Sequence, residues 1–166
     1  MLSPASNARL NAVYPPLAAL VRQLAEQLLS DGIQIIVAQA MRTVAEQDAL
    51  YAQGRTAPGR IVTNARGGHS YHNFGLAVDL APLAADGSVN WNASHPAWKR
   101  MEEAGVALGM TSGANWTRIV DAPHFQVTGR FPEAGPDDEL RAILASDGLG
   151  AVWRAVSDSR GDGWAG

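Results

Sequence analysis

Residues 67–82, GGHSYHNFGLAVDLAP, join a polar, glycine-rich segment directly to a short apolar one. Side chains along a strand point alternately to its two faces. One face of such a strand carries Gly75, Ala77 and Asp79, and the other carries Leu76, Val78 and Leu80. The second face is apolar and is expected in the core, whereas the first has only small side chains before Asp79. The stretch therefore predicts a buried strand with open space beside a carboxylate.

Periodic patterns on both sides of this stretch predict helices and further strands. Apolar residues at three- and four-residue steps from Leu17 to Leu28 predict an amphipathic helix that follows Pro15 and Pro16 and ends before Gly32. A strand is predicted at 33–40, and a helix from Val44 to about Gln53 after a Thr43–Glu46 capping box. Another helix is predicted from Pro96 to about Leu108, with Ser94 and Pro96 marking its start. A strand with His124 and Gln126 on one face follows, and then helical segments from Pro136 and over 148–156.

The glycine-rich, basic segment 54–68 is predicted to be a long loop. Long ordered loops in compact domains are often functional, but this composition also fits a flexible lid or a solvated connection. The sequence leaves these alternatives open.

Composition limits the possible functions. A chain of 166 residues with 46% hydrophobic and 17% charged residues has the size and composition of one folded domain. The net charge of −3 gives no basic field for nucleic acid. The N-terminus lacks a basic start followed by an apolar run, so we expect synthesis in the cytoplasm without a signal peptide. Charged and amide residues interrupt the apolar stretch 17–29, so membrane insertion is not expected.

The chain contains no cysteine, so any metal must be held by His, Asp or Glu. Three candidates are His72, Asp79 and His124, because catalytic zinc takes three nitrogen or oxygen ligands and keeps a fourth position for water. Asp121, three positions before His124, is the candidate general base. Positions i and i+3 of a straight strand face opposite ways, but Pro123 favours a bend that could bring both side chains together. His69 and His95 are interpreted as structural histidines.

The pattern Ser70-x-His72-x-x-Gly75-x-Ala77-x-Asp79 resembles the signature of the M15 family, the zinc-dependent D-Ala-D-Ala carboxypeptidases and VanY-like peptidases. Together with the segment before it and the later DAPHFQ, it is most similar to the family's L-alanyl-D-glutamate endopeptidases, which include endolysins. The resemblance extends over about residues 33–126. It implies an α+β fold of the Hedgehog/D-Ala-D-Ala peptidase type, with a small antiparallel sheet and flanking helices. We expect one peptidase domain over 1–166, with its core at about 14–130 and a C-terminal helical extension of unknown role at 131–166.

The resemblance also implies the roles of individual residues. One Zn²⁺ would be held by His72, Asp79 and His124, with Asp121 as general base. Arg42 would bind a substrate carboxylate or polarise the carbonyl. Ser70 would position substrate, and Trp116 would either pack against the peptide or belong to the core. Two departures from the family are TSGANW (111–116), where relatives often have W-G-G-x-W, and AQAM (38–41) before Arg42.

The expected function is cleavage of the L-Ala–D-Glu bond in peptidoglycan stem peptides by a monomer that reaches the cell wall after holin-type release. The alternative to this route is a bacterial enzyme that stays in the cytoplasm or is exported in another way. Two alternatives are a D,D- or L,D-carboxypeptidase that trims terminal D-Ala and an inactive zinc-containing module that binds the cell wall. The loop 54–68 and an aspartate at position 121 favour the endopeptidase over the carboxypeptidase. The presence of all three ligands and the base disfavours the inactive module. The C-terminal extension is expected either to cover the core or to contact wall polymer through Trp153 and Trp164.

Overall fold

The computed structural model describes residues 1–117 and 120–161. The chain forms two compact units, each built from two separate stretches of sequence. The first unit contains residues 1–40 and 77–127, and the second contains residues 41–76 and 128–166. The single peptidase domain expected from the sequence stays a prediction. Trp164 lies outside the described residues.

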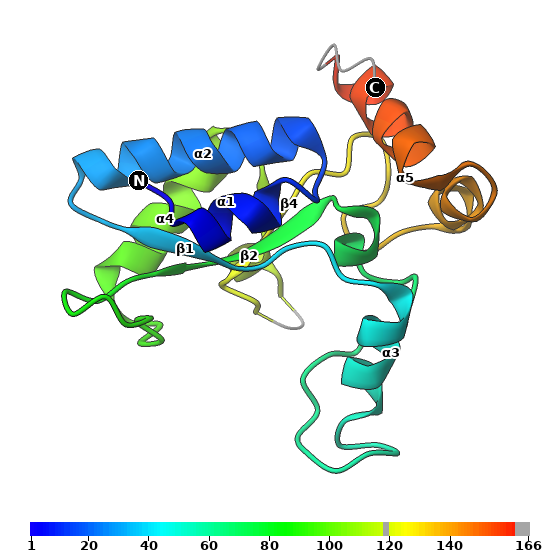
Figure 1. The fold of residues 1–166 in the computed structure, drawn as a ribbon, viewed down its shortest axis with the longest axis horizontal. Coiled ribbons are helices and arrows are strands. Elements are labelled where there is room, and N and C mark those ends of the chain that lie inside the picture. The colour runs from blue at the N-terminus through cyan, green and yellow to red at the C-terminus, as the bar shows by residue number, and fades with distance from the viewer. Residues whose placement is uncertain (118–119, 162–166) are drawn as a thin grey trace. The chain divides into compact units, whose positions relative to one another are not determined.

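The first unit contains a four-stranded antiparallel sheet in the order β1-β2-β4-β3. Its strands are β1 (Ile35–Gln39), β2 (Ala77–Pro82), β3 (Thr111–Ser112) and β4 (His124–Gln126). Its helices are α1 (Pro4–Leu10), α2 (Pro15–Ser30) and α4 (Pro96–Ala107). Figure 1 shows α2 and α4 side by side, and α4 also packs on β2 and β3. The small antiparallel sheet with flanking helices that the sequence predicted is thereby confirmed.

Sheet register and helix packing explain which face of the sheet is polar. Val78 pairs with Phe125 across β2 and β4, and Asp79 pairs with His124. Directly paired residues of antiparallel strands share a face, and neighbours along a strand alternate. The Phe125 ring lies so close to Gly105 of α4 that a Cβ there would come within 2.5 Å of it. The Val78–Phe125 pair therefore faces the helices, and the Asp79–His124 pair faces away from them.

The helices of this unit largely follow the sequence patterns. The apolar stripe of α2 is buried except for the half-buried Leu20, and Pro15 and Pro16 form the first turn of the helix rather than preceding it. Helix α4 begins at Pro96, as predicted, and its N-cap is His95, whose Nδ1 accepts the Ala97 N–H at 3.2 Å. His95 is thus structural, as predicted. Helix α1 was missed, although Ser3 caps it by accepting the Ser6 N–H at 3.1 Å.

The second unit contains α3 (Val44–Ala52), the 3₁₀ turn η1 (Tyr71–Phe74) and α5 (Asp138–Arg160). The predicted capping box at Thr43 and Glu46 is present at the start of α3. The two helical segments predicted after position 136 are the two halves of α5, which meet at a kink where Gly148 has φ 75°. Trp153, a predicted wall contact, donates from Nε1 to the Phe74 carbonyl at 2.8 Å and so joins α5 to η1.

The loop 54–68 is tied to α3 by exposed and half-buried hydrogen bonds. Arg55 donates to the carbonyls of Tyr51 and Thr63 and to the side chain of Asn64. Gln47 of α3, which is fully buried, donates to the Ala65 carbonyl at 2.8 Å. These contacts favour an ordered loop among the alternatives that the sequence left open. Within the described ranges, no helix is both long and apolar enough to cross a membrane.

Candidate metal centre

The cross-strand pair of Asp79 and His124 forms the centre of the candidate site. Their register places both side chains on the sheet face away from the helices. His124 Nδ1 lies 3.4 Å from Asp79 Oδ1. The imidazole is buried and the carboxylate is half-buried. Burial of a carboxylate beside an imidazole nitrogen is favourable only if a proton or a cation lies between them.

Gln126 determines which ring nitrogen of His124 carries the proton. The side chains of His124 and Gln126 lie on one strand face, as predicted, and His124 Nε2 is 2.9 Å from Gln126 Oε1. An amide oxygen accepts, so Nε2 carries the proton and the neutral ring presents its lone pair at Nδ1. Second hydrogen bonds of this kind orient metal-ligating histidines. Gln126 therefore holds His124 in the tautomer that a metal ion requires at Nδ1.

The surroundings of His124 also raise its pKa, which means that they favour the positively charged ring. Burial alone lowers this pKa, since it disfavours the charged ring. The hydrogen bond and charge of Asp79, the hydrogen bond to Gln126 and the charge of Asp121 all raise it, and together they outweigh burial. The net result is a pKa raised above the ordinary histidine value. The position beside Nδ1 thus stabilises a proton or a metal cation.

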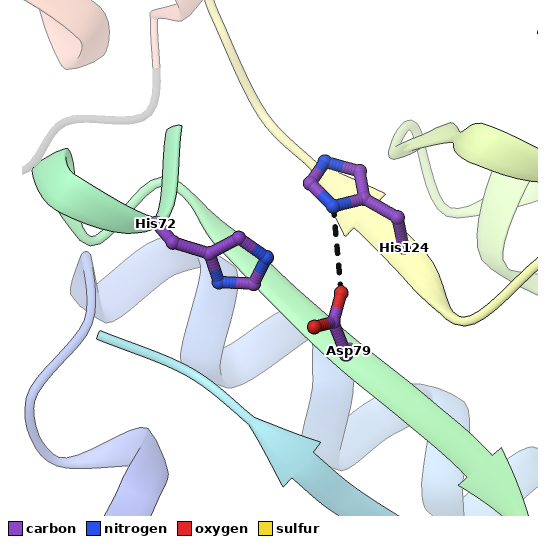
Figure 2. Close-up of side chains that lie close together, drawn as sticks. All are labelled: His72, Asp79 and His124. Carbon is purple, nitrogen blue, oxygen red and sulfur yellow. Dashed lines mark ion pairs between the residues drawn. The ribbon is translucent and has the colours of Figure 1, made fainter. Parts of the chain in front are cut away.

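His72 completes the set of three predicted ligands. It is buried in η1, where its carbonyl accepts the Arg42 N–H at 3.0 Å. One potential ligand atom from each of His72, Asp79 and His124 lies within 4.8 Å of the others. Figure 2 shows the His72 ring beside the Asp79–His124 pair.

The donor set fits zinc. Two ligands at about 2.1 Å from a tetrahedral ion lie roughly 3.4 Å apart, and the Asp79–His124 pair already has a separation of 3.4 Å. Two neutral imidazoles and one carboxylate leave a net charge of about +1 around a divalent ion. A centre of this charge attracts carboxylates and stabilises developing oxyanions.

Asp121 lies in a turn that brings it back to His124, as the proline at position 123 predicted. The Asp121 carbonyl accepts the His124 N–H at 3.1 Å, which closes the turn. The charge of Asp121 raises the pKa of His124, so the carboxylate acts on the ring. The predicted bend is present, and the role of Asp121 as general base stays a prediction.

Trp116 lies beside the same histidine. Its ring centroid is 4.9 Å from that of His124, with the planes tilted by 45°. The side chain is half-buried. It therefore covers one side of His124 and is not a fully buried core aromatic, which leaves its predicted contact with the peptide untested.

Arg42 and Ser70 flank the segment that carries His72. Arg42 Nη1 donates to Gln47 Oε1 at 2.6 Å, so the buried glutamine connects this guanidinium to the loop 54–68. Ser70 precedes η1, and its carbonyl accepts the Asn73 N–H at 2.9 Å. His69 is exposed and lies 3.4 Å from Arg141 Nη1.

Sequence reasoning missed the roles of Gln47, Gln126 and Gly113, which contact predicted site residues. The sequence did contain an indication for Gln126, because this residue was predicted on the same strand face as His124. Gln47 had none, since an inward-facing glutamine in a helix has no distinctive pattern.

Fold and site together define a small α+β protein with a candidate metal site of two histidines and one carboxylate. A family model of M15 peptidases, described as D-alanyl-D-alanine carboxypeptidase, matches residues 63–127. The peptidoglycan L-alanyl-D-glutamate endopeptidase CwlK of Bacillus subtilis (strain 168) is 40% identical over 119 residues, which are 65% of this chain and 71% of that protein. The chain belongs to the M15 peptidase family.

Two further relatives extend this similarity. The L-alanyl-D-glutamate peptidase of Listeria phage A118 is 29% identical over 122 residues, which cover 73% of this chain and 40% of the phage protein. The crystal structure of the Serratia marcescens L-Ala D-Glu endopeptidase ChiX aligns with a TM-score of 0.59 and 25% sequence identity. This alignment covers 78% of this chain and 92% of ChiX.

Proposed function

We propose that this chain is a zinc peptidase that cleaves the L-Ala–D-Glu bond of peptidoglycan stem peptides. The observation that carries the proposal is the convergence of His72, Asp79 and His124 within 4.8 Å. The 40% identity to an L-alanyl-D-glutamate endopeptidase supports the choice of bond. The activities of the phage and Serratia relatives, both L-alanyl-D-glutamate peptidases, support it as well.

In this proposal, His72, Asp79 and His124 hold the zinc ion. When bound, zinc acts as a Lewis acid that polarises a carbonyl and promotes the ionisation of water. Asp121 accepts a proton from the attacking water and returns it to the leaving amine. Gln126 keeps the proton of His124 on Nε2 and so leaves Nδ1 available to the metal.

Other residues bind the substrate. Stem peptides carry free carboxylates, and the planar guanidinium of Arg42 can bind a carboxylate through two parallel hydrogen bonds. Gln47 restricts the guanidinium by accepting from Nη1. Ser70 is proposed to position the peptide, and Trp116 to cover the metal site beside His124.

We further propose that residues 1–166 act as one peptidase domain and as a monomer, and that the protein reaches the cell wall after holin-type release from the cytoplasm. The similarity to a phage peptidase supports this route.

Mass spectrometry of muropeptides tests the proposal. Purified sacculi are incubated with the zinc-loaded protein and the soluble products are analysed. New N-terminal D-Glu supports the endopeptidase, whereas loss of one alanine from the stem would indicate the carboxypeptidase, which the description of the matching family model favours. Binding to sacculi without hydrolysis would indicate the inactive wall-binding module.

A single variant tests the general base. Asp121→Asn keeps the size of the side chain but cannot accept a proton from water, so we expect a loss of at least about 10²-fold in kcat with zinc still bound at one equivalent. Elemental analysis and muropeptide hydrolysis measure the two quantities. Wild-type hydrolysis by this variant would exclude Asp121 as the base.

A further inference from the structure

Gly113 is hydrogen-bonded to both Trp116 and Asp121, the two residues that lie beside His124. It is the first residue of the 3₁₀ turn η2 (Gly113–Asn115), within the TSGANW segment that departs from the family pattern. Its carbonyl accepts the N–H of Asp121 at 3.0 Å and the N–H of Trp116 at 3.2 Å. One peptide group thus fixes the backbone of both the proposed base and the aromatic ring that covers the ligand.

There is no space for a side chain at Gly113. A Cβ built on this residue would lie 2.5 Å from the Asp121 carbonyl oxygen, 3.2 Å from Asp121 Cβ and 3.0 Å from His124 Cβ. Real Cβ atoms essentially never lie within 3.0 Å of a heavy atom outside their own residue and its two chain neighbours. Gly113 is not among the glycines with positive φ, so its backbone conformation would allow any residue. Contact with the neighbouring turn is what excludes a side chain at this position.

The contacts are unequal, and this inequality determines which group a substitution would move. The contact with the Asp121 carbonyl is shorter than ordinary van der Waals distance by roughly 1 Å, whereas the contact with His124 needs an adjustment of a few tenths of an ångström. His124 is held by the β2–β4 pairing and by Gln126, while Asp121 lies outside the strand. A methyl group at position 113 would therefore displace mainly Asp121.

We propose that Gly113 is a positioning residue for the reaction, which sets the place of the Asp121 carboxylate relative to His124 by its lack of a side chain. This inference rests on the proposed function, since it requires Asp121 to be the base. A misplacement of about 1 Å in a catalytic group can cost on the order of 10²-fold in rate. A glycine selected only for folding would show no such dependence on Asp121.

The first test compares Gly113→Ala with Gly150→Ala. Gly150 lies in α5, has an ordinary backbone conformation, and leaves 3.6 Å between a new Cβ and its nearest neighbour, Arg154 Nη1. We expect Gly113→Ala to lower kcat on purified muropeptides by about 10²-fold, with KM changed little and one equivalent of zinc retained. Gly150→Ala is expected to match the wild type. Wild-type kcat for Gly113→Ala, or failure of this variant to fold by circular dichroism, would overturn the proposal.

A double-mutant cycle then asks whether the effect passes through Asp121. Once Asp121→Asn has removed the base, its position no longer matters, so adding Gly113→Ala should lower kcat by no more than about threefold. Losses that multiply would show that Gly113 acts independently of Asp121 and would refute the positioning role. If Asp121→Asn alone hydrolyses like the wild type, the assignment of the base under the proposed function fails instead.

Discussion

Replacement of Gln126 by leucine is expected to weaken zinc binding by about 10- to 100-fold, without removing a ligand. Gln126 is 1% exposed, and its Oε1 lies 2.9 Å from His124 Nε2. Leucine fills a similar volume but accepts no hydrogen bond. The Nε2–H would be left without this acceptor, which costs about 1–3 kcal/mol for a buried donor.

The neutral ring can avoid part of this cost by moving its proton to Nδ1, where Asp79 Oδ1 is 3.4 Å away. That tautomer cannot bind metal through Nδ1, so zinc binding must first reverse the change. The cost therefore falls mainly on the metal-bound state. A loss of 10- to 100-fold corresponds to about 1.4–2.8 kcal/mol, which agrees with the cost of an unsatisfied buried donor.

Competition with a chromophoric chelator at fixed pH measures the zinc affinity of the Gln126 variants. Gln47→Leu is the matched control, because Gln47 is 0% exposed and its hydrogen bonds go to Arg42, Thr63 and Ala65. It should bind zinc within about twofold of the wild type. Gln126→Glu retains an acceptor and should bind zinc at least as tightly as the wild type. Unchanged zinc affinity in Gln126→Leu would refute the tautomer argument.

Three further predictions concern the ligand His72, the Asp79–His124 pair and the contact between Gly105 and Phe125. His72→Ala should contain little or no zinc after dialysis, and one retained equivalent by elemental analysis would contradict the ligand set. Because Asp79 raises the pKa of His124, a proton competes with the metal at higher pH than for an ordinary histidine. Zinc affinity should therefore fall as pH decreases through this raised pKa, and a flat titration by chelator competition would contradict the role of His124. Gly105→Ala should lower the Tm of the metal-free protein by roughly 2–10 °C, because its Cβ would overpack against Phe125; an unchanged calorimetric Tm would show that the ring can shift freely.

Local patterns predicted the elements that carry the site. The capping box at Thr43 fixed the start of α3, and the two helices predicted after position 136 correspond to the two halves of α5. Alternation along β2 correctly assigned Val78 to the core and Asp79 to the opposite face. These predictions succeeded because cap residues and hydrophobic periodicity act within a few positions of the chain.

Features that depend on distant segments could not be read from such patterns. Nothing local shows that Asp79 pairs with His124, or that β4 lies between β2 and β3. The two-residue strand β3 is too short for a periodic signal, and it was predicted as part of a loop. Gly113 was noted only as part of a departure from the family pattern, since the atoms that exclude its side chain belong to the turn at Asp121.

The abrupt change from polar to apolar residues in 67–82 has a physical reason in the sheet. Val78 and Leu80 are fully buried, so they fix which face of β2 packs on the core. Because side chains alternate, the same burial turns Asp79 to the other face, where its register partner is His124. A slip of one residue in β2 would expose the apolar pair and bury the carboxylate, so the free energy that stabilises the core also holds the ligand pair in place.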